Sequence, residues 1–410
     1  MKLALVSEHA NPLAALGGAD AGGQNVHLAE LASGLAALGH QVTVYTRRDA
    51  VGLPARVHAQ GGYVVEHVPA GPPTEVPKDD LLPFMDGFGD RLRERWRHDP
   101  VDLVHAHFWM SGLAALRATR GTGVPVVQTF HALGSVKRRE QGSADTSPEQ
   151  RIDLERRICA EATHVVATCS DEVAELRALG LPPGRATIVP CGVDVDHFRP
   201  LAAARSGRGA QRRHRLLVVG RLVQRKGIGT TVEALRSLPD AELVVVGGPP
   251  AHALAADPAV QRLRRLAEDL GVADRLHFTG SLDRDDMPAA INACDVVVSA
   301  PWYEPFGIVP LEAMASGRPV VGTAVGGLLD TVVPGLTGEL VPPRDPVALA
   351  EALGDLLADP ERRARYGAAG RARAVERYDW RTVSQQTETV YRAVSGSIDQ
   401  DAPYRKEYVR

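Results

Sequence analysis

The chain has 410 residues, of which 44% are hydrophobic and 24% are charged, and its formal net charge is -3. This length exceeds one typical hydrophobic core, so we expect two domains. The nearly balanced charge excludes the strongly basic surface typical of nucleic-acid-binding domains, and it favours a small-molecule partner.

The sequence contains no stretch long and apolar enough for a membrane span, and its first residues lack the length and cleavage site of a secretory signal. We therefore expect a cytoplasmic protein with no membrane partner. The four cysteines are scattered, with no Cys-x-x-Cys spacing, and we interpret them as buried thiols. They are Cys159, Cys169, Cys191 and Cys294.

Residues 1–46 predict a strand, a loop, a helix and a second strand. Apolar residues recur at helical spacing from Gln24 to Leu38, and Gly39 follows where a left-handed C-cap would lie. Further strands are predicted within 101–107, 124–131, 163–170 and 186–192. These runs lack polar alternation, which indicates burial on both faces and therefore a parallel sheet covered by helices.

A break in composition at residues 197–215, rich in arginine, glycine and alanine, predicts a linker. The alternation then resumes, with strands expected within 214–221, 241–248, 275–280, 295–300 and 319–324. Residues 345–395 are predicted to form helices, with breaks at Pro360 and near 378–380. The predicted fold is thus α/β, with two doubly wound, Rossmann-like domains over 1–196 and 197–377 and a last helix, 378–397, packing back on the first.

Ligands of parallel sheets bind beyond the carboxyl ends of the strands, so we expect the functional residues in the loops that follow the strands. In the glycine-rich segment 17–25, Gly22 and Gly23 directly precede the first helix, whose free N–H groups could receive a phosphate. A plain flexible turn is the alternative. The segment does not match G-x-G-x-x-G, which disfavours a redox cofactor.

Residues 220–227 follow a strand and present Arg221 and Lys226 between glycines. Two fixed cations can neutralise a leaving diphosphate without a metal ion. A solvated basic loop is the alternative interpretation of this segment taken alone.

Residues 304–312, EPFGIVPLE, place Glu304 just past a strand and Gly307 before a helix. We expect Pro310 and Glu312 in the first turn of that helix, so that both carboxylates face one crevice. Carboxylates accept hydrogen bonds from vicinal sugar hydroxyls, and N–H groups at a helix start meet phosphate. A helix cap alone would explain one glutamate but not both.

His131 ends a predicted strand and should point into the same cleft, as a hydrogen-bond donor to a sugar hydroxyl or as an ordinary structural histidine. Metal binding by His105 and His107 is not expected, because no third ligand with zinc spacing follows. The aspartates of 194–196 and 283–286 fit turns and helix caps better than a metal site. We therefore predict no metal ion.

Taken together, GGADAGGQN, GRLVQRKG and the Glu304-x7-Glu312 segment resemble retaining glycosyltransferases of family 4, which have the GT-B fold. The resemblance covers nearly the whole chain. Within that family, AGGQNV, HFWMSG and HALGSVK are similar to the actinobacterial enzymes that transfer N-acetylglucosamine to inositol phosphate, and to sucrose synthases.

The resemblance implies a role for each matching residue. Gly22 and Gly23 would meet the donor phosphate, Arg221 and Lys226 would hold the diphosphate, Leu282 would lie near the base, and Glu312 would bind the ribose hydroxyls. Glu304, with the N–H groups around Phe306, Gly307 and Ile308, would hold the donor sugar, and His131 would touch its hydroxymethyl group. Asn25, Lys78, Phe108 and Ala132 would face the acceptor.

Two positions depart from the inositol-phosphate enzymes, in which the resemblance implies tyrosine and threonine as phosphate ligands. Here these positions are Phe108 and Ala132. Each lost hydrogen bond should weaken phosphate binding by about 1 to 3 kcal/mol. We therefore expect a neutral sugar, a cyclitol or a specialised metabolite as acceptor.

We therefore predict a retaining transferase that uses a nucleotide diphosphate sugar. The expected nucleotide is UDP, with GDP as the alternative, and no cofactor is expected. The resemblance implies front-face substitution, in which the departing phosphate takes the acceptor's proton. A GT-B-fold epimerase or phosphorylase is the rival enzyme, and a two-domain solute-binding protein is the rival from another class. A homodimer is compatible with the sequence.

Overall fold

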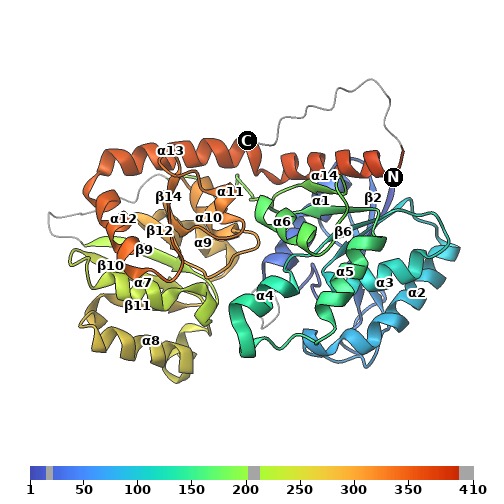
Figure 1. Ribbon diagram of the computed structural model, residues 1–410, viewed down its shortest axis with the longest axis horizontal. Coiled ribbons are helices and arrows are strands. Elements are labelled where there is room, and N and C mark those ends of the chain that lie inside the picture. Colours follow the sequence, from blue (N-terminus) through green and yellow to red (C-terminus); the bar gives the residue numbers. More distant parts are fainter. Residues whose placement is uncertain (15–21, 202–212, 397–410) are drawn as a thin grey trace.

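The computed structural model describes residues 1–14, 22–201 and 213–396, and it forms two domains that lie side by side, each built on one sheet (Figure 1). The first sheet has eight strands in the order β3-β4-β2-β1-β5-β6-β7-β8. These are β1 (Lys2–Val6), β2 (Gln41–Arg47), β3 (Arg56–His58), β4 (Val64–Val68), β5 (Leu103–His107), β6 (Val126–Thr129), β7 (His164–Ala167) and β8 (Ala186–Ile188).

The second sheet has six strands in the order β11-β10-β9-β12-β13-β14, and every pair in it is parallel. Its strands are β9 (His214–Val219), β10 (Ala241–Val246), β11 (Leu276–Gly280), β12 (Val296–Ser299), β13 (Val320–Thr323) and β14 (Gly338–Val341). Both sheets are doubly wound, as the uninterrupted apolar runs predict.

One part of the sheet prediction is wrong. The edge strand β3 pairs antiparallel with β4, in the register Arg56 to Glu66. Since β3 is short and half exposed, it lacks an apolar run and was not predicted; β4 and β14 were not predicted either. An edge strand needs a partner on one side only, so an antiparallel hairpin suffices there.

Helices cover both faces of each sheet (Figure 1). They are α1 (Gly23–Ala37), α2 (Met85–His98), α3 (Trp109–Thr119), α4 (Gly134–Gln141), α5 (Arg151–Glu161), α6 (Ser170–Ala178), α7 (Ile228–Leu235), α8 (Pro258–Asp269), α9 (Met287–Asn292), α10 (Ile308–Ala315), α11 (Leu328–Thr331), α12 (Pro346–Ala358), α13 (Pro360–Arg377) and α14 (Trp380–Val394). Short 3-10 turns are η1 (Lys78–Asp80), η2 (Leu82–Phe84), η3 (Gly142–Ala144), η4 (Gln224–Lys226), η5 (Ala251–Ala256), η6 (Ala273–Arg275) and η7 (Arg284–Asp286).

The chain crosses between the domains twice. Helix α13 lies along the second domain, and α14 continues over the first, where it packs against α1 (Figure 1). The apolar side chains of α14 complete a core cluster of the first domain; they are Trp380, Val383, Val390 and Tyr391. The two crossings touch each other, because the Val193 N–H donates to the Tyr378 carbonyl at 2.7 Å.

Candidate active site between the two domains

The centre of the site is an ion pair between the Lys226 ammonium and the Glu304 carboxylate. Lys226 ends η4, in the loop after β9, and Glu304 lies in the loop after β12, the strand next to β9 in the sheet. Burial opposes ionisation of Glu304. The charge and hydrogen bond of Lys226, the nearby Arg225 and the Gly307 N–H outweigh that effect and hold the pKa of Glu304 below its usual value.

Glycines allow these loops to approach one another. Gly227 has a φ of 66°, and a Cβ on it would lie 1.7 Å from the Ala300 carbonyl oxygen, so only glycine fits there. Gly326, in the loop after β13, likewise has a φ of 48° and lies against the Glu304 backbone, whose carbonyl accepts the Gly327 N–H at 2.8 Å. Three neighbouring strands thus bring their carboxyl-end loops together around Glu304.

Helix α10 begins at this point, with Gly307 as its N-cap in the left-handed conformation. Its free N–H groups and positive dipole end lie beside Glu304. The prediction that Glu312 lies in the first turn is wrong: the helix begins at Ile308, directly after Gly307 as expected, but Glu312 is its fifth residue and a turn holds only about 3.6 residues. Burial raises the pKa of Glu312 to about 7, although the nearby Arg284 acts to lower it.

The start of the first helix of the first domain faces these loops of the second domain. Helix α1 begins at Gly23 with Gly22 as N-cap. A Cβ on Gly23 would lie 2.9 Å from Ile308 Cδ1, so the starts of α1 and α10 meet at this glycine. Asn25 is used within its own loop: its Oδ1 accepts the Gly22 N–H at 3.1 Å, and its Nδ2 donates to the Asn11 carbonyl at 2.9 Å. The residues of the glycine segment before Gly22 lie outside the described residues.

Two first-domain strands are followed by residues with a strained backbone. Phe108 follows β5 with a φ of 79°, and His131 follows β6 with a φ of 63°. Left-handed backbone is uncommon for residues other than glycine, and such strain gathers at functional sites. Both side chains are buried, and the His131 ring lies 5.1 Å from the ring of Phe306 in the second domain.

His131 belongs to a buried cluster of four histidines, which the sequence did not reveal: His27, His105, His107 and His131. Burial lowers the pKa of His27 to about 4 and that of His105 to about 3. Burial, followed by the neighbouring histidines, also lowers the pKa of His107 and of His131 well below the usual value. All four rings are therefore neutral at pH 7.

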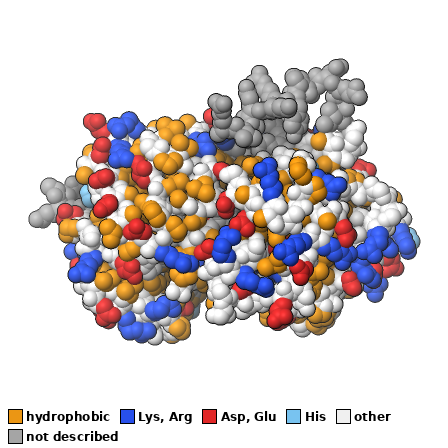
Figure 2. All heavy atoms as spheres, in the orientation of Figure 1, with side chains coloured by type: hydrophobic (Ala, Val, Ile, Leu, Met, Phe, Trp, Pro, Cys, Tyr) orange, Lys and Arg blue, Asp and Glu red, His pale blue; other side chains and the backbone are white. Residues whose placement is uncertain are grey.

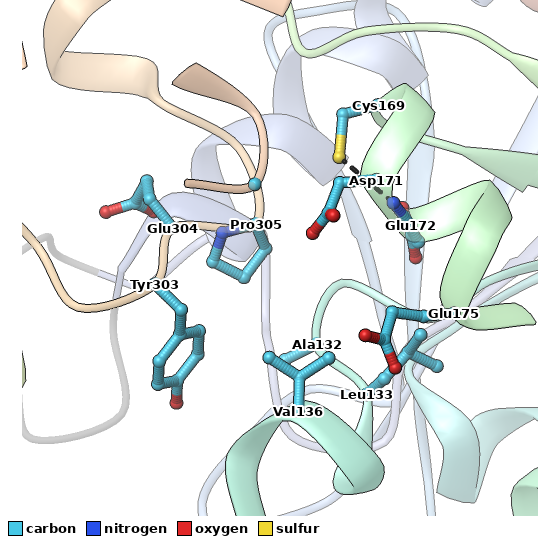
Figure 3. Close-up of a pocket in the computed structure, with 11 residues that line it drawn as sticks. Ala132, Leu133, Val136, Cys169, Asp171, Glu172, Glu175, Tyr303, Glu304 and Pro305 are labelled. Carbon is cyan, nitrogen blue, oxygen red and sulfur yellow. Dashed lines mark hydrogen bonds between the residues drawn. The ribbon is translucent and has the colours of Figure 1, made fainter. Parts of the chain in front are cut away.

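A small pocket lies between the domains beside Glu304 (Figure 3). The second domain contributes the loop 303–305 and Gly326. The first domain contributes the start of α4 and residues on and before α6, including Glu172, whose pKa is raised by burial. Figure 3 shows Tyr303 and Pro305 opposite Val136 and Asp171. Ala132, predicted on the acceptor side, lines this pocket.

Arg151 lies next to these first-domain loops and was not singled out from the sequence. It is buried, its Nε donates to Glu155 at 2.8 Å, and its other nitrogens donate to the Ala132 carbonyl and to the Ser147 hydroxyl. Its guanidinium lies 5.2 Å from the Phe108 ring centroid. One N–H group of each guanidinium nitrogen is therefore bound to a group of the protein itself.

The remaining predicted residues lie in loops around this centre. Arg221 is exposed in the loop after β9, and Leu282 is half-buried after β11. Lys78 begins η1 in the first domain, beside Asp79, which pairs with Lys137 at 3.5 Å.

Several contacts join the domains and were missed by the sequence analysis. Gln141 donates to the Tyr303 hydroxyl at 2.7 Å, and Thr168 donates to the Pro305 carbonyl at 3.1 Å. Asp330 of α11 accepts two hydrogen bonds from Ser170 at the start of α6. No sequence pattern marks such pairs, because each depends on how the domains are placed.

All four cysteines are free and buried, which confirms their prediction. Among residues 1–14, 22–201 and 213–396, no three His, Cys, Asp or Glu side chains gather as a metal ion would require, and no helix is long and apolar enough to cross a membrane. Basic and acidic side chains are mixed over the visible face of both domains (Figure 2).

Comparison with known proteins agrees with this arrangement. Residues 21–197 match the family model "Glycosyltransferase Family 4", and residues 205–373 match "Glycosyl transferases group 1". A D-inositol 3-phosphate glycosyltransferase of Streptomyces avermitilis is 36% identical over 409 residues, covering 96% of this chain and 87% of the relative. One from Frankia alni is 38% identical, covering 89% of this chain and 93% of the relative.

Solved structures give the same fold. Sucrose-phosphate synthase from Thermosynechococcus elongatus superposes with a TM-score of 0.87 at 33% identity, covering 97% of this chain and 100% of that one. Anabaena HepE, solved in complex with UDP and glucose, has a TM-score of 0.71 at 21% identity, covering 95% of this chain and 99% of that one. The two facing Rossmann-like domains are therefore those of a GT-B glycosyltransferase.

Proposed function

The chain belongs to the glycosyltransferases of group 1 and family 4, and from this membership we propose that it is a retaining, metal-independent transferase that uses a nucleotide diphosphate sugar. The observation that carries the proposal is the Lys226–Glu304 ion pair beside the N-terminus of α10, directly across from the start of α1. This arrangement offers a cation for a leaving diphosphate and carboxylates for sugar hydroxyls within one gap.

In this proposal Lys226 and Arg221 take the charge that builds on the diphosphate as the bond to the sugar breaks. Gly23 and the first N–H groups of α10 meet the phosphates, because free N–H groups and the positive end of a helix favour anions. Glu312 accepts the ribose hydroxyls, and Glu304 accepts hydroxyls of the donor sugar. His131 contacts the hydroxymethyl group of that sugar.

In this proposal the protein contributes to catalysis by stabilising the charge on the leaving diphosphate and by positioning the two substrates. The described site offers no nucleophile with triad-like partners, and the proposed chemistry is front-face substitution, in which the departing phosphate oxygen takes the acceptor's proton. Closing the domains excludes water and aligns the acceptor with the donor sugar. UDP is the proposed nucleotide of the donor, and HepE, which has the same fold, was solved in complex with UDP and glucose.

We propose a small, neutral acceptor, such as a sugar or cyclitol. The Phe108 and Ala132 side chains carry no hydrogen-bonding group, and the guanidinium of Arg151 beside them is already bound to Glu155, the Ala132 carbonyl and Ser147. Turning this guanidinium away from Glu155 and toward a phosphate would break a buried ion pair, at a cost on the order of 3 to 5 kcal/mol.

The test uses the purified chain with UDP-, GDP-, ADP- and TDP-glucose and follows hydrolysis of the donor without acceptor. Release of α-glucose, detected by NMR before mutarotation, would support retention. Activity that persists in EDTA would support metal independence. A donor converted to its epimer, or a sugar phosphate formed only with added phosphate, would identify the rival enzymes, and binding without any turnover would favour a solute-binding protein.

A further inference from the structure

The histidine cluster contains one hydrogen bond whose direction has consequences for the site. His107 Nδ1 and His131 Nε2 lie 3.0 Å apart, and both rings are buried. Among the described residues, the second nitrogen of each ring, His107 Nε2 and His131 Nδ1, is also buried but has no hydrogen-bond partner. Buried polar atoms without partners are rare in native proteins and call for an explanation.

In His105, two residues earlier on β5, both ring nitrogens have hydrogen-bond partners. The Thr129 hydroxyl donates to the Val166 carbonyl at 3.0 Å, so it must accept its second bond from His105 Nε2–H at 2.9 Å. His105 Nδ1 then accepts from the Tyr391 hydroxyl at 2.6 Å. Both nitrogens of this ring have partners, and its tautomer is determined by the protein alone.

A neutral imidazole carries one N–H and one lone pair. If His107 Nδ1 donates to His131 Nε2, then His131 carries its proton on Nδ1 as well. If instead His131 Nε2 donates, then His107 carries its proton on Nε2. The shared bond therefore gives both rings the same tautomer, and the tautomer of His107 decides whether the free Nδ1 of His131 is a donor or an acceptor.

The two arrangements differ in what remains unsatisfied once a hydroxyl binds His131 Nδ1. When both rings carry the proton on Nδ1, only a lone pair on His107 Nε2 is left over. When both carry it on Nε2, an N–H of His107 is left buried without an acceptor. Orphaned buried N–H groups are rarer than under-satisfied acceptors, so the first arrangement is favoured with ligand bound.

We propose that His107 is a positioning residue that fixes His131 in the Nδ1–H tautomer, so that His131 donates a hydrogen bond to a hydroxyl of the donor sugar. This inference rests on the proposed function, in which that hydroxyl belongs to the hydroxymethyl group. The strained backbone of His131 and the Phe306 ring beside it hold the imidazole in place. His107 acts through His131 and does not itself touch the substrate.

Three variants separate this role from simple packing. In His107→Asn the amide N–H can occupy the place of Nδ1–H, whereas His107→Phe keeps the ring volume without any donor. His105→Phe is the matched control, because it removes two hydrogen bonds from the same strand without touching His131.

Two-bond 1H–15N correlation spectra of protein labelled with 15N-histidine report which ring nitrogen holds the proton, and His→Asn variants assign the signals. We expect His107 and His131 to share one tautomer in the free protein and both to be Nδ1–H with UDP-glucose bound. Different tautomers on the two rings, or an Nε2–H form of His131 in that complex, would overturn the proposal.

The second readout is the ratio of kcat/KM for hydrolysis of UDP-glucose over UDP-xylose, which lacks the hydroxymethyl group. We expect His107→Phe and His131→Ala each to lower this ratio about tenfold, His107→Asn to keep most of it, and His105→Phe to keep it while lowering Tm. An unchanged ratio in His107→Phe would overturn the proposal. If neither nucleotide sugar binds or reacts, the proposed function fails instead, whereas the tautomers of the free protein still test the pairing of the rings.

Discussion

The Asp330 carboxylate of the second domain holds Ser170 of the first domain through both the backbone N–H, at 2.6 Å, and the hydroxyl, at 2.7 Å. Asp330 thereby caps the start of α6, where negative charge is favourable. The contact can form only when the domains are close together. It therefore stabilises the present arrangement of the domains, in which we propose that donor and acceptor are aligned.

Removing this contact should favour opening. In Asp330→Ala we expect a larger radius of gyration by small-angle X-ray scattering and a several-fold rise in the donor KM. Because the pair is partly exposed, the loss should be about 1 kcal/mol. Ser170→Ala keeps the backbone N–H and should show a smaller effect. If neither the radius nor the KM changes in Asp330→Ala, the contact does not stabilise closure.

Lys226 is expected to contribute mainly to turnover. Lys226→Ala should lower kcat for donor hydrolysis by about 100-fold, by analogy with the loss of a donor that stabilises developing negative charge. Lys2→Ala serves as the control, since it breaks a lysine–carboxylate pair, with Asp99, on the outer surface. Single-turnover kinetics measure both. Near-wild-type turnover in Lys226→Ala would contradict the role proposed for this residue.

Because the pKa of Glu312 lies near neutrality, we expect donor binding to depend on pH. This pKa is raised to about 7, and the ionised carboxylate is the better acceptor for ribose hydroxyls. Donor affinity should therefore increase as the pH rises from 6 to 8, and calorimetry with UDP should detect this increase. Glu312→Gln should bind UDP more weakly and without that dependence. An equally steep pH dependence in Glu312→Gln would assign the titration to another group.

The same group affects stability in the opposite direction. Because the folded-state pKa lies above the ordinary value of 4.5, folding favours the protonated form. The stabilisation from Glu312 is thus complete below pH 4.5 and is lost as the pH rises toward and through 7. The difference in Tm between the wild type and Glu312→Gln should follow this course, with Glu312→Gln gaining relative to the wild type as the pH rises. A constant difference from pH 5 to pH 8 would show that the carboxyl has an ordinary pKa.

The acceptor proposal is tested by restoring the missing hydroxyls. The double variant Phe108→Tyr, Ala132→Thr should bind inositol 3-phosphate more tightly than the wild type, by about 1 to 3 kcal/mol for each hydrogen bond formed. Binding of unphosphorylated inositol is the control and should change little. If the wild-type protein already prefers inositol 3-phosphate to inositol, as measured by calorimetry, the neutral-acceptor proposal is wrong.

The sequence predicted what depends on local pattern. Uninterrupted apolar runs gave most strands of both sheets, and the break near residue 378 corresponds to the end of α13 at Arg377 and the start of α14 at Trp380. The Glu304-x7-Glu312 spacing indicated a helix start after a strand, and Gly307 does precede α10, but Glu312 is the fifth residue of that helix and so lies beyond its first turn. The left-handed conformation of Gly307 is set by the neighbouring loops and is not visible in the spacing.

What the sequence could not supply is contact between distant segments. His27 lies in α1, His107 ends β5 and His131 lies in the loop after β6, and their common burial depends on the order of strands in the sheet. Asp330 looks like an ordinary surface residue until the two domains are placed. Arg151 likewise carries no signal of its own, because its partner Glu155 at helical spacing resembles any exposed ion pair.

Helix α14 has a consequence for how the protein is made. The first domain buries Trp380, Val383, Val390 and Tyr391 in its core, yet these residues are synthesised after the whole second domain. Domains at the start of a chain generally fold during synthesis. Here the first domain cannot complete its core until α14 has been synthesised, so part of its apolar surface stays uncovered during synthesis. A chain shortened before Trp380 should therefore aggregate even though both of its sheets are present.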